Sequence, residues 1–84
     1  MKTITIRYFA SIREALGTGS ETVQTSATTI EALRDELIAR GGIHAEVLAR
    51  GKAVRVALNQ IMSSEAAELI DGAELAFFPP VTGG

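Results

Sequence analysis

The residues best able to do chemistry are the last two in the sequence, Gly83 and Gly84. Glycine has no side chain, so the only reactive group beyond Thr82 would be the terminal carboxylate. A free carboxylate is a poor electrophile, and we expect it to be activated as an acyl-adenylate before it takes part in group transfer. The sequence therefore predicts a reactive carboxyl end at Gly84, with a frayed terminus as the alternative.

The segment before these glycines reads FFPPV over residues 77–81 and is expected to restrict the backbone where the end of the chain leaves the domain. Pro79 and Pro80 have no N–H to donate, so they end strand pairing and favour a stiff, extended backbone. At about 3.3–3.6 Å per residue, residues 79–84 can reach about 20 Å. We expect 79–84 to be a flexible tail that can enter the active site of another protein.

Motifs of conventional catalysis do not occur in the sequence. His44 is the only histidine, and we interpret it as a surface loop residue. Nothing resembles a nucleophile elbow or a catalytic triad, and no glycine-rich phosphate loop follows a strand. Acidic pairs are interpreted as solvated faces, so no metal site is predicted. The chain has no cysteine and hence no thiol nucleophile, so if it carries sulfur, the main-chain carboxyl end is the expected place.

The first part of the chain predicts two strands joined by a short helix. Polar and apolar residues alternate over residues 3–9, which places Ile4, Ile6 and Tyr8 on one face of a strand. A helix is expected to begin at the capping box that starts at Ser11 and to end at Gly17. Residues 21–25 read as the second strand.

The rest of the chain predicts one long helix and three short strands. A second capping box, over residues 28–31, precedes a helix predicted to run from Ile30 to about Arg40, with an apolar stripe of Ile30, Leu33 and Leu37. The 43–51 segment has no decisive pattern, and a helical turn that carries Val47 and Leu48 is one interpretation of it. Strands are expected over 53–58, 61–62 and 74–78. This order predicts an α+β domain over residues 1–78, in which one helix covers one face of a mixed sheet.

Composition narrows the class of protein. With 84 residues the chain is one small domain, and 46% hydrophobic residues are ample for a core. A net charge of −2 gives no electrostatic footprint for nucleic acid or an anionic membrane. The apolar runs are too short for a membrane span, and residues 1–2 lead directly into a strand pattern without a secretory signal. We therefore expect a cytoplasmic protein.

Two apolar residues lie on the outward face of their strands, where polar residues are expected, and they predict a surface that binds a partner. Phe78 lies on the outward phase of the last strand and Phe9 on the outward phase of the first. If the two strands are neighbours, both rings share one surface, which Met62 could join from the short strand at 61–62. Exposed contiguous apolar surface on a small protein marks a binding site. The alternative is that the 43–51 segment covers these rings.

Taken together, these residues resemble the small, sulfur-carrying subunits of molybdopterin synthases, a family of ubiquitin-like β-grasp proteins. The resemblance spans nearly the whole chain in order and rests on YFA at 8–10, RE at 13–14, LG at 16–17, TIEAL at 29–33, VALNQ at 56–60, DG at 71–72 and AFFPPVTGG at 76–84. One departure is Ala73, where the family usually has an acidic residue.

The resemblance implies a reaction cycle at Gly84 and a set of partners. An ATP-dependent adenylating enzyme would convert the carboxylate to an adenylate, and a sulfur donor would convert that to a thiocarboxylate (thioglycine). The chain would bind no cofactor and have no autonomous active site. It would act as the sulfur-donating subunit of a sulfurtransferase, a heterotetramer with two large subunits, and pass sulfur to cyclic pyranopterin monophosphate. The implied contacts with the large subunit are Phe9, Met62, Phe78 and the tail residues Pro79, Pro80, Val81, Thr82 and Gly83.

Three other functions remain open at this point. The Gly-Gly end would also suit a sulfur carrier of another pathway, such as thiazole synthesis or tRNA thiolation, although residues 77–80 favour the molybdopterin version. A ubiquitin-like protein modifier would end in an isopeptide bond to lysine. The last alternative is a β-grasp interaction module whose tail has no role.

Overall fold

The structure, a computed structural model, describes residues 1–79. Within that range the elements follow in the order β1 (Lys2–Tyr8), α1 (Ala10–Leu16), β2 (Ser20–Thr25), α2 (Ile30–Ile38), α3 (Gly42–Val47), β3 (Arg55–Leu58), β4 (Ile61–Ser63) and β5 (Glu74–Phe78). The expected strands are confirmed, and the last one has the predicted bounds. The 53–58 strand is shorter than predicted, because pairing begins only at Arg55.

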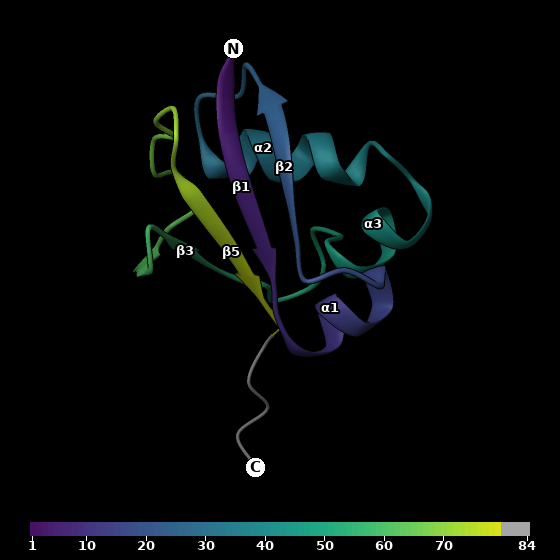
Figure 1. Ribbon diagram of the computed structural model, residues 1–84. Coiled ribbons are helices and arrows are strands. Elements are labelled where there is room, and N and C mark those ends of the chain that lie inside the picture. Colours follow the sequence, from purple (N-terminus) through teal and green to yellow (C-terminus); the bar gives the residue numbers. More distant parts are fainter. Residues whose placement is uncertain (80–84) are drawn as a thin grey trace.

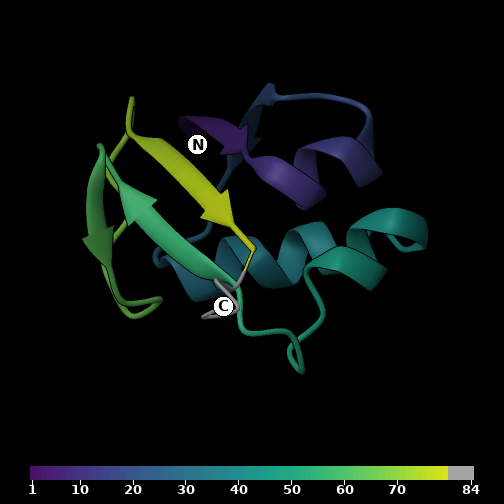
Figure 2. The same ribbon diagram turned by 90° about the horizontal axis from the view of Figure 1, so that it is seen from below.

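The strands form one mixed sheet in the order β2-β1-β5-β3-β4. β1 and β5 lie side by side and run parallel, while the other neighbouring pairs are antiparallel (Figure 1). The sheet curves around α2, which runs along one of its faces (Figure 2). This arrangement confirms the predicted α+β class and is that of a β-grasp fold.

The core lies between the sheet and α2. It is formed by the apolar residues that alternate with polar ones in β1 and by the apolar stripe of α2. Ile4, Ile6 and Tyr8 are no more than 1% exposed, as are the predicted stripe residues of α2 and Phe77 of β5. Inward residues of neighbouring strands therefore meet the helix stripe directly, and the burial of each such side chain stabilises the fold by about 1.5–3 kcal/mol. The outward face of the sheet is left without a helix in the described part of the chain.

Both predicted capping boxes are wrong in their positions. The N-cap of α1 is Phe9, not Ser11, and no side chain caps this helix. The cause is tertiary: the N–H of Phe9 donates to the carbonyl of Phe77 at 3.2 Å, and the carbonyl of Phe9 accepts from the N–H of Ile12. Pairing with β5 thus fixes where the helix begins. Gly17 ends it as predicted, with a φ of 76° that favours glycine.

α2 begins at Ile30, as predicted, but its N-cap is Thr29 and not Thr28. The Oγ1 of Thr29 accepts from the N–H of Ala32 at 3.2 Å. Thr29 also forms an isolated bridge with Glu68, so the 64–69 segment helps to select this residue as the cap. The helix ends at Ile38, two residues before the expected end at Arg40.

The 43–51 segment, left open by the sequence, contains α3 and then Leu48, which is completely buried. α3 packs on α1 and α2, on the helix side of the sheet. It does not cover Phe9 and Phe78, so the alternative that this segment hides the two rings is wrong.

Buried Arg34 of α2 ties this segment down. Its side chain is 3% exposed and donates to the carbonyls of Leu48 and Ala49 at 2.8 Å and of Lys52 at 3.2 Å. It also forms a 2.6 Å ion pair with Glu65. A buried guanidinium is tolerated when its donors are satisfied in this way.

Candidate functional site

The candidate site lies where β5 ends and the C-terminal segment begins. The parallel register places Tyr8 opposite Phe77, so the next residues, Phe9 and Phe78, also become neighbours. Their rings stack with centroids 4.6 Å apart and an interplanar angle of 10°. Both side chains are half-buried. The predicted meeting of these two aromatics is confirmed.

A shallow groove of about 270 Å³ runs from this aromatic pair to Met62 on the outward face of the sheet. Its apolar base is made by Ala57 and Ala76, which are opposite each other in the β3–β5 register. Because both are alanines, the surface is hollowed there between larger side chains. Met62 is 57% exposed and pairs with Ala57 across β3 and β4. The groove therefore joins the three residues that the sequence predicted as one apolar surface.

A tight turn at Asn59 and Gln60 positions β4, and with it Met62. Both turn residues have a left-handed φ, 51° and 69°, as a two-residue hairpin of this kind requires. Asn59 tolerates that conformation, and its Oδ1 accepts from the N–H of Glu74 at 2.9 Å. The turn is thus fastened to the start of β5, which fixes the far end of the groove.

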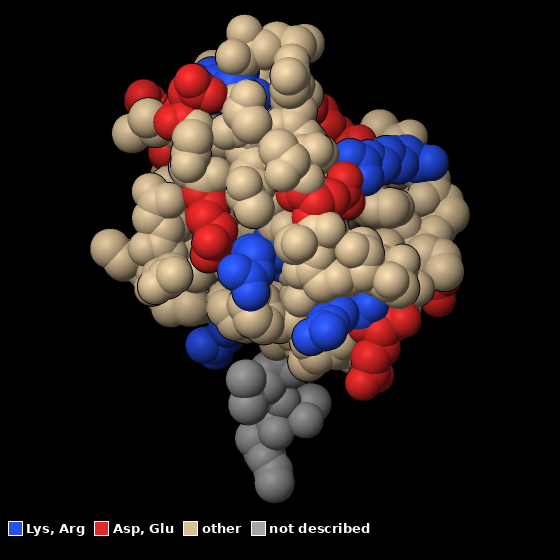
Figure 3. Space-filling view, viewed as in Figure 1, with Lys and Arg blue, Asp and Glu red and all other residues tan. Residues whose placement is uncertain are grey.

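Charged residues form the rim of the groove. The guanidinium carbon of Arg7 lies 5.7 Å from the centroid of the Phe9 ring, and its NH1 is 3.8 Å from Oε2 of Glu74. Both side chains are partly exposed, so this ion pair contributes little to stability. Basic and acidic side chains are interspersed over the face seen in Figure 3. An apolar centre with a charged rim is typical of a protein-binding surface.

A cluster of titratable side chains around Glu21 lies away from the groove. The hydroxyl of Tyr8 donates to Glu21 at 2.7 Å, Arg40 donates to the same carboxylate at 2.9 Å, and His44 Nε2 is 3.7 Å from it. Burial raises the pKa of Tyr8, and the hydrogen bond to Glu21 adds to this. Burial also acts to raise the pKa of Glu21, but hydrogen bonds from Tyr8 and Arg40 outweigh it and hold that pKa below its usual value.

These contacts give the cluster a structural role. It ties β1 and β2 to α3 and to the residues after α2. His44 is not the loop residue that was predicted, because it lies in α3, where its side chain is 25% exposed. Among residues 1–79, no group of three or more His, Cys, Asp or Glu side chains could hold a metal ion. No helix in this range is long and apolar enough to cross a membrane.

The predicted tail lies mostly beyond the described chain. Pro79 is described and faces a different cavity from that of Phe78, on the helix side of the molecule. Pro80, Val81, Thr82, Gly83 and Gly84 were predicted as tail and site residues and lie outside the described residues.

Two parts of the groove were missed by the sequence reasoning. Arg7 was not recognised as part of the groove, although it alternates in phase with Phe9. Ala57 and Ala76 were not recognised as the base of a groove. The signal for them was available, because each lies on the outward phase of a strand next to a larger outward residue.

Comparisons with known proteins give close matches over nearly the whole chain. The model of the ThiS family matches residues 6–84. The chain is 43% identical over 81 residues to the molybdopterin synthase sulfur carrier subunit of Escherichia coli, covering 96% of this chain and 99% of the relative. It is 37% identical over 81 residues, with the same coverage, to the protein of that name in Haemophilus influenzae.

The fold also occurs in solved structures. A putative molybdopterin converting factor, subunit 1, from Pyrococcus furiosus superposes with a TM-score of 0.78 at 24% identity, covering 96% of this chain and all of that chain. A chain in the complex of subunits 1 and 2 of the molybdopterin-converting factor from Helicobacter pylori gives a TM-score of 0.67 at 24% identity, covering 98% and 99%. At this identity the two structures support the fold alone.

Proposed function

Because the chain belongs to the ThiS family, we propose that it is the sulfur carrier subunit of a molybdopterin synthase. The observation that carries this proposal is the 43% identity to a curated subunit of that name over 99% of its length. The fold adds a physical reason, since β5 ends at Phe78 beside an apolar groove and residues 79–84 follow it in the sequence.

The chemistry takes place at the carboxylate of Gly84, as the carboxyl terminus of the working chain. The carboxylate attacks the α-phosphorus of ATP on an adenylating enzyme, which releases pyrophosphate and leaves an acyl-adenylate. A donor with sulfur at the oxidation level of sulfide attacks the acyl carbon, and AMP leaves. The product is a thiocarboxylate. ATP belongs to the activating partner, and the carrier itself needs no cofactor.

The large subunit of the synthase receives the loaded tail. There the thiocarboxylate sulfur bonds to a carbon of cyclic pyranopterin monophosphate as that carbon gives up a bond to oxygen, and water then cleaves the acyl–sulfur bond. Sulfur remains on the substrate and Gly84 returns to a carboxylate. The assembly contains two carrier and two large subunits, and the large subunit supplies the catalytic side chains.

The groove is the docking surface for the large subunit. Phe9, Phe78 and Met62 provide apolar anchor positions around a base of two alanines, and Arg7 and Glu74 provide a polar rim. Aromatic anchors within a polar rim are the usual source of binding energy in such interfaces. Docking here brings the large subunit to the end of β5, where the tail begins.

The test is a reconstituted reaction with a chain that lacks Gly84. Purified adenylating enzyme, ATP, sulfide, large subunit and cyclic pyranopterin monophosphate are combined with the full chain or the truncated one, and molybdopterin is quantified. We expect product with the full chain and none with the truncated chain, while both show the same thermal unfolding midpoint. Equal product from both chains would rule out Gly84 as the sulfur-carrying residue.

A further inference from the structure

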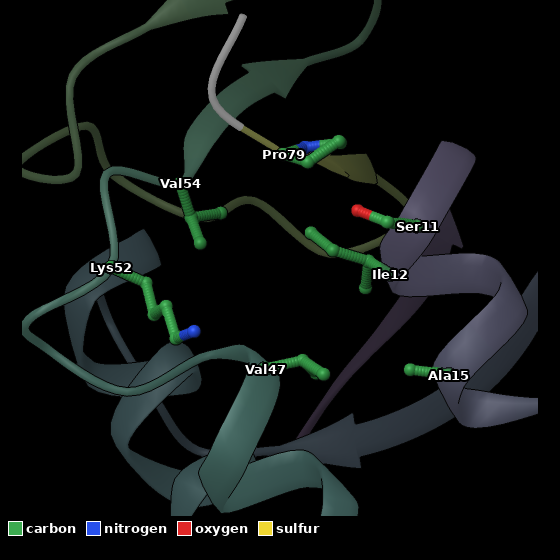
Figure 4. A pocket seen from close by; sticks show the side chains of 7 residues that line it. All are labelled: Ser11, Ile12, Ala15, Val47, Lys52, Val54 and Pro79. Atoms are coloured by element: carbon green, nitrogen blue, oxygen red, sulfur yellow. The ribbon is translucent and has the colours of Figure 1, made fainter. Parts of the chain in front are cut away.

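A second cavity, of about 390 Å³, lies on the helix side of the molecule at the point where the described chain ends. Most of its lining is apolar: Ile12 and Ala15 come from α1, Val47 from the end of α3 and Val54 from the segment before β3. Pro79 completes the wall (Figure 4). The cavity therefore adjoins the base of the tail, on the side away from the Phe9–Phe78 groove.

Among the described residues that line this cavity, Lys52 is the only charged one. Its amine and the hydroxyl of Ser11 point into the open space from opposite walls (Figure 4). Ion pairs elsewhere use arginines or His44, and none within residues 1–79 involves Lys52. The cavity thus combines apolar walls with a cation that no described carboxylate neutralises.

The backbone that presents Lys52 is held from inside the protein. Arg34 donates to the carbonyl of Lys52 and to those of Leu48 and Ala49, and the N–H of Lys52 donates to the carbonyl of Ala49 at 2.9 Å. From outside, Arg50 is bound to Asp35 and to Glu65, the latter at 2.7 Å. These contacts fix the segment before binding, so little ordering is required when a partner docks.

We propose that this cavity is a second contact site for the large subunit, and that it takes an apolar side chain of that subunit together with a neighbouring carboxylate. The inference rests on the proposed function, because it requires a partner that receives the tail. Pro79 belongs both to the cavity wall and to the start of the tail, so a protein that encloses the following residues is brought to the cavity mouth. The apolar walls favour an apolar side chain, and the Lys52 amine favours a carboxylate.

The two contact sites have complementary roles. Phe78 faces the groove on one side of the sheet, and the next residue, Pro79, faces the cavity on the other. A partner that occupies both sites holds the base of the tail from two sides. This fixes the direction in which the tail leaves the domain and reduces the conformational freedom that must be lost on insertion.

The test uses the two lysines of the chain, Lys52 and Lys2. Lys2 lies at the start of β1 and donates to the carbonyl of Ala27 at 3.2 Å, so it serves as an internal control. The free chain and its preformed complex with the large subunit are acetylated with an N-hydroxysuccinimide ester, and each lysine is quantified by peptide mass spectrometry. We expect Lys52 to be protected several-fold in the complex and Lys2 to react equally in both samples. Equal acetylation of Lys52 in both would overturn the proposal.

A pair of variants separates this proposal from the proposed function. Lys52→Met keeps the apolar stem and removes the charge, whereas Lys52→Arg keeps the charge. We expect Lys52→Met to raise the Kd for the large subunit by about 2- to 5-fold and to make this Kd less dependent on salt concentration. Lys52→Arg should keep the Kd and the salt dependence of the wild-type chain. If the wild-type chain binds but Lys52→Met matches it at every salt concentration, the cavity proposal is wrong. If the wild-type chain does not bind, the proposed function fails as well.

Discussion

Phe9 and Phe78 stack with their ring centroids 4.6 Å apart, although they come from opposite ends of the chain. The parallel pairing of β1 with β5 produces this contact, because the register that places Tyr8 opposite Phe77 also brings the following residues together. One ring begins α1 and the other precedes the tail. The contact therefore forms an apolar anchor at the base of the tail that does not depend on a loop.

We expect Phe9→Ala and Phe78→Ala each to weaken binding of the large subunit by about 1–3 kcal/mol, the range for aromatic anchors. The double variant should lose less than the sum, because each ring packs on the other. Isothermal titration calorimetry measures both effects. Ile70→Ala is a suitable control, since Ile70 is 63% exposed and lies before β5, at the far end of that strand. Unchanged affinity in both single variants would mean that the groove is not the docking surface.

Replacement of Arg34 should destabilise the domain strongly. In Arg34→Met the carbonyls of Leu48, Ala49 and Lys52 lose their donor, and Glu65 loses its 2.6 Å partner. We expect a loss of about 3–5 kcal/mol in the free energy of unfolding, as for other broken buried ion pairs. Urea denaturation measures it, with the exposed Arg55→Met as a control that should change stability by less than about 0.5 kcal/mol. A small effect at Arg34 would show that the 48–52 segment is held by other contacts.

Stability should fall in acid partly because of Glu21. Burial acts to raise its pKa, but hydrogen bonds from Tyr8 and Arg40 leave the pKa in the folded state below the ordinary value of 4.5. The unfolded state therefore binds the proton more readily, and the stabilisation is present above pH 4.5 and lost as the pH falls through the folded pKa. In urea denaturation at a series of pH values, the free energy of unfolding should fall less steeply with decreasing pH in Glu21→Gln than in the wild type. Identical slopes would contradict this assignment.

Tyr8 should produce the opposite dependence in alkali. Burial, followed by the hydrogen bond to Glu21, raises the pKa of Tyr8 above its ordinary value of 10.0. Its contribution to stability is therefore complete below pH 10 and is lost as the pH rises further. Tyr8→Phe keeps the buried ring but cannot ionise, so its stability should decline less in this range. A decline equal to that of the wild type would show that Tyr8 is not the group responsible.

Much of the fold was predictable because its strands have one buried face. Alternation located β1 and the bounds of β5, and a stripe of three apolar residues located α2. The N-cap residues of the helices were less predictable, since they depend on partners distant in the sequence. The backbone of Phe9 is hydrogen-bonded to that of Phe77 in β5, and Thr29 forms an isolated β-bridge with Glu68. Local capping signals at Ser11 and Thr28 could not compete with these contacts.

The candidate site was predictable to a similar degree. Phe9, Phe78 and Met62 could be grouped from strand phase, because that grouping needs only the neighbouring positions of strands. The cavity at Lys52 could not, since it depends on the path of residues 48–52. That path is set by Arg34, which lies next to the apolar stripe of α2 and whose acceptors are mostly backbone carbonyls without a sequence signature.

The central claim, that Gly84 carries sulfur as a thiocarboxylate, is tested most directly by the intact mass of the chain. The protein is incubated with ATP, its adenylating enzyme and sulfide, and the C-terminal peptide is then analysed by mass spectrometry. We predict the mass increase of one oxygen replaced by sulfur, located at Gly84 and dependent on ATP. An unchanged C-terminal mass under these conditions, or conjugates through an isopeptide bond to lysine in its place, would contradict the account.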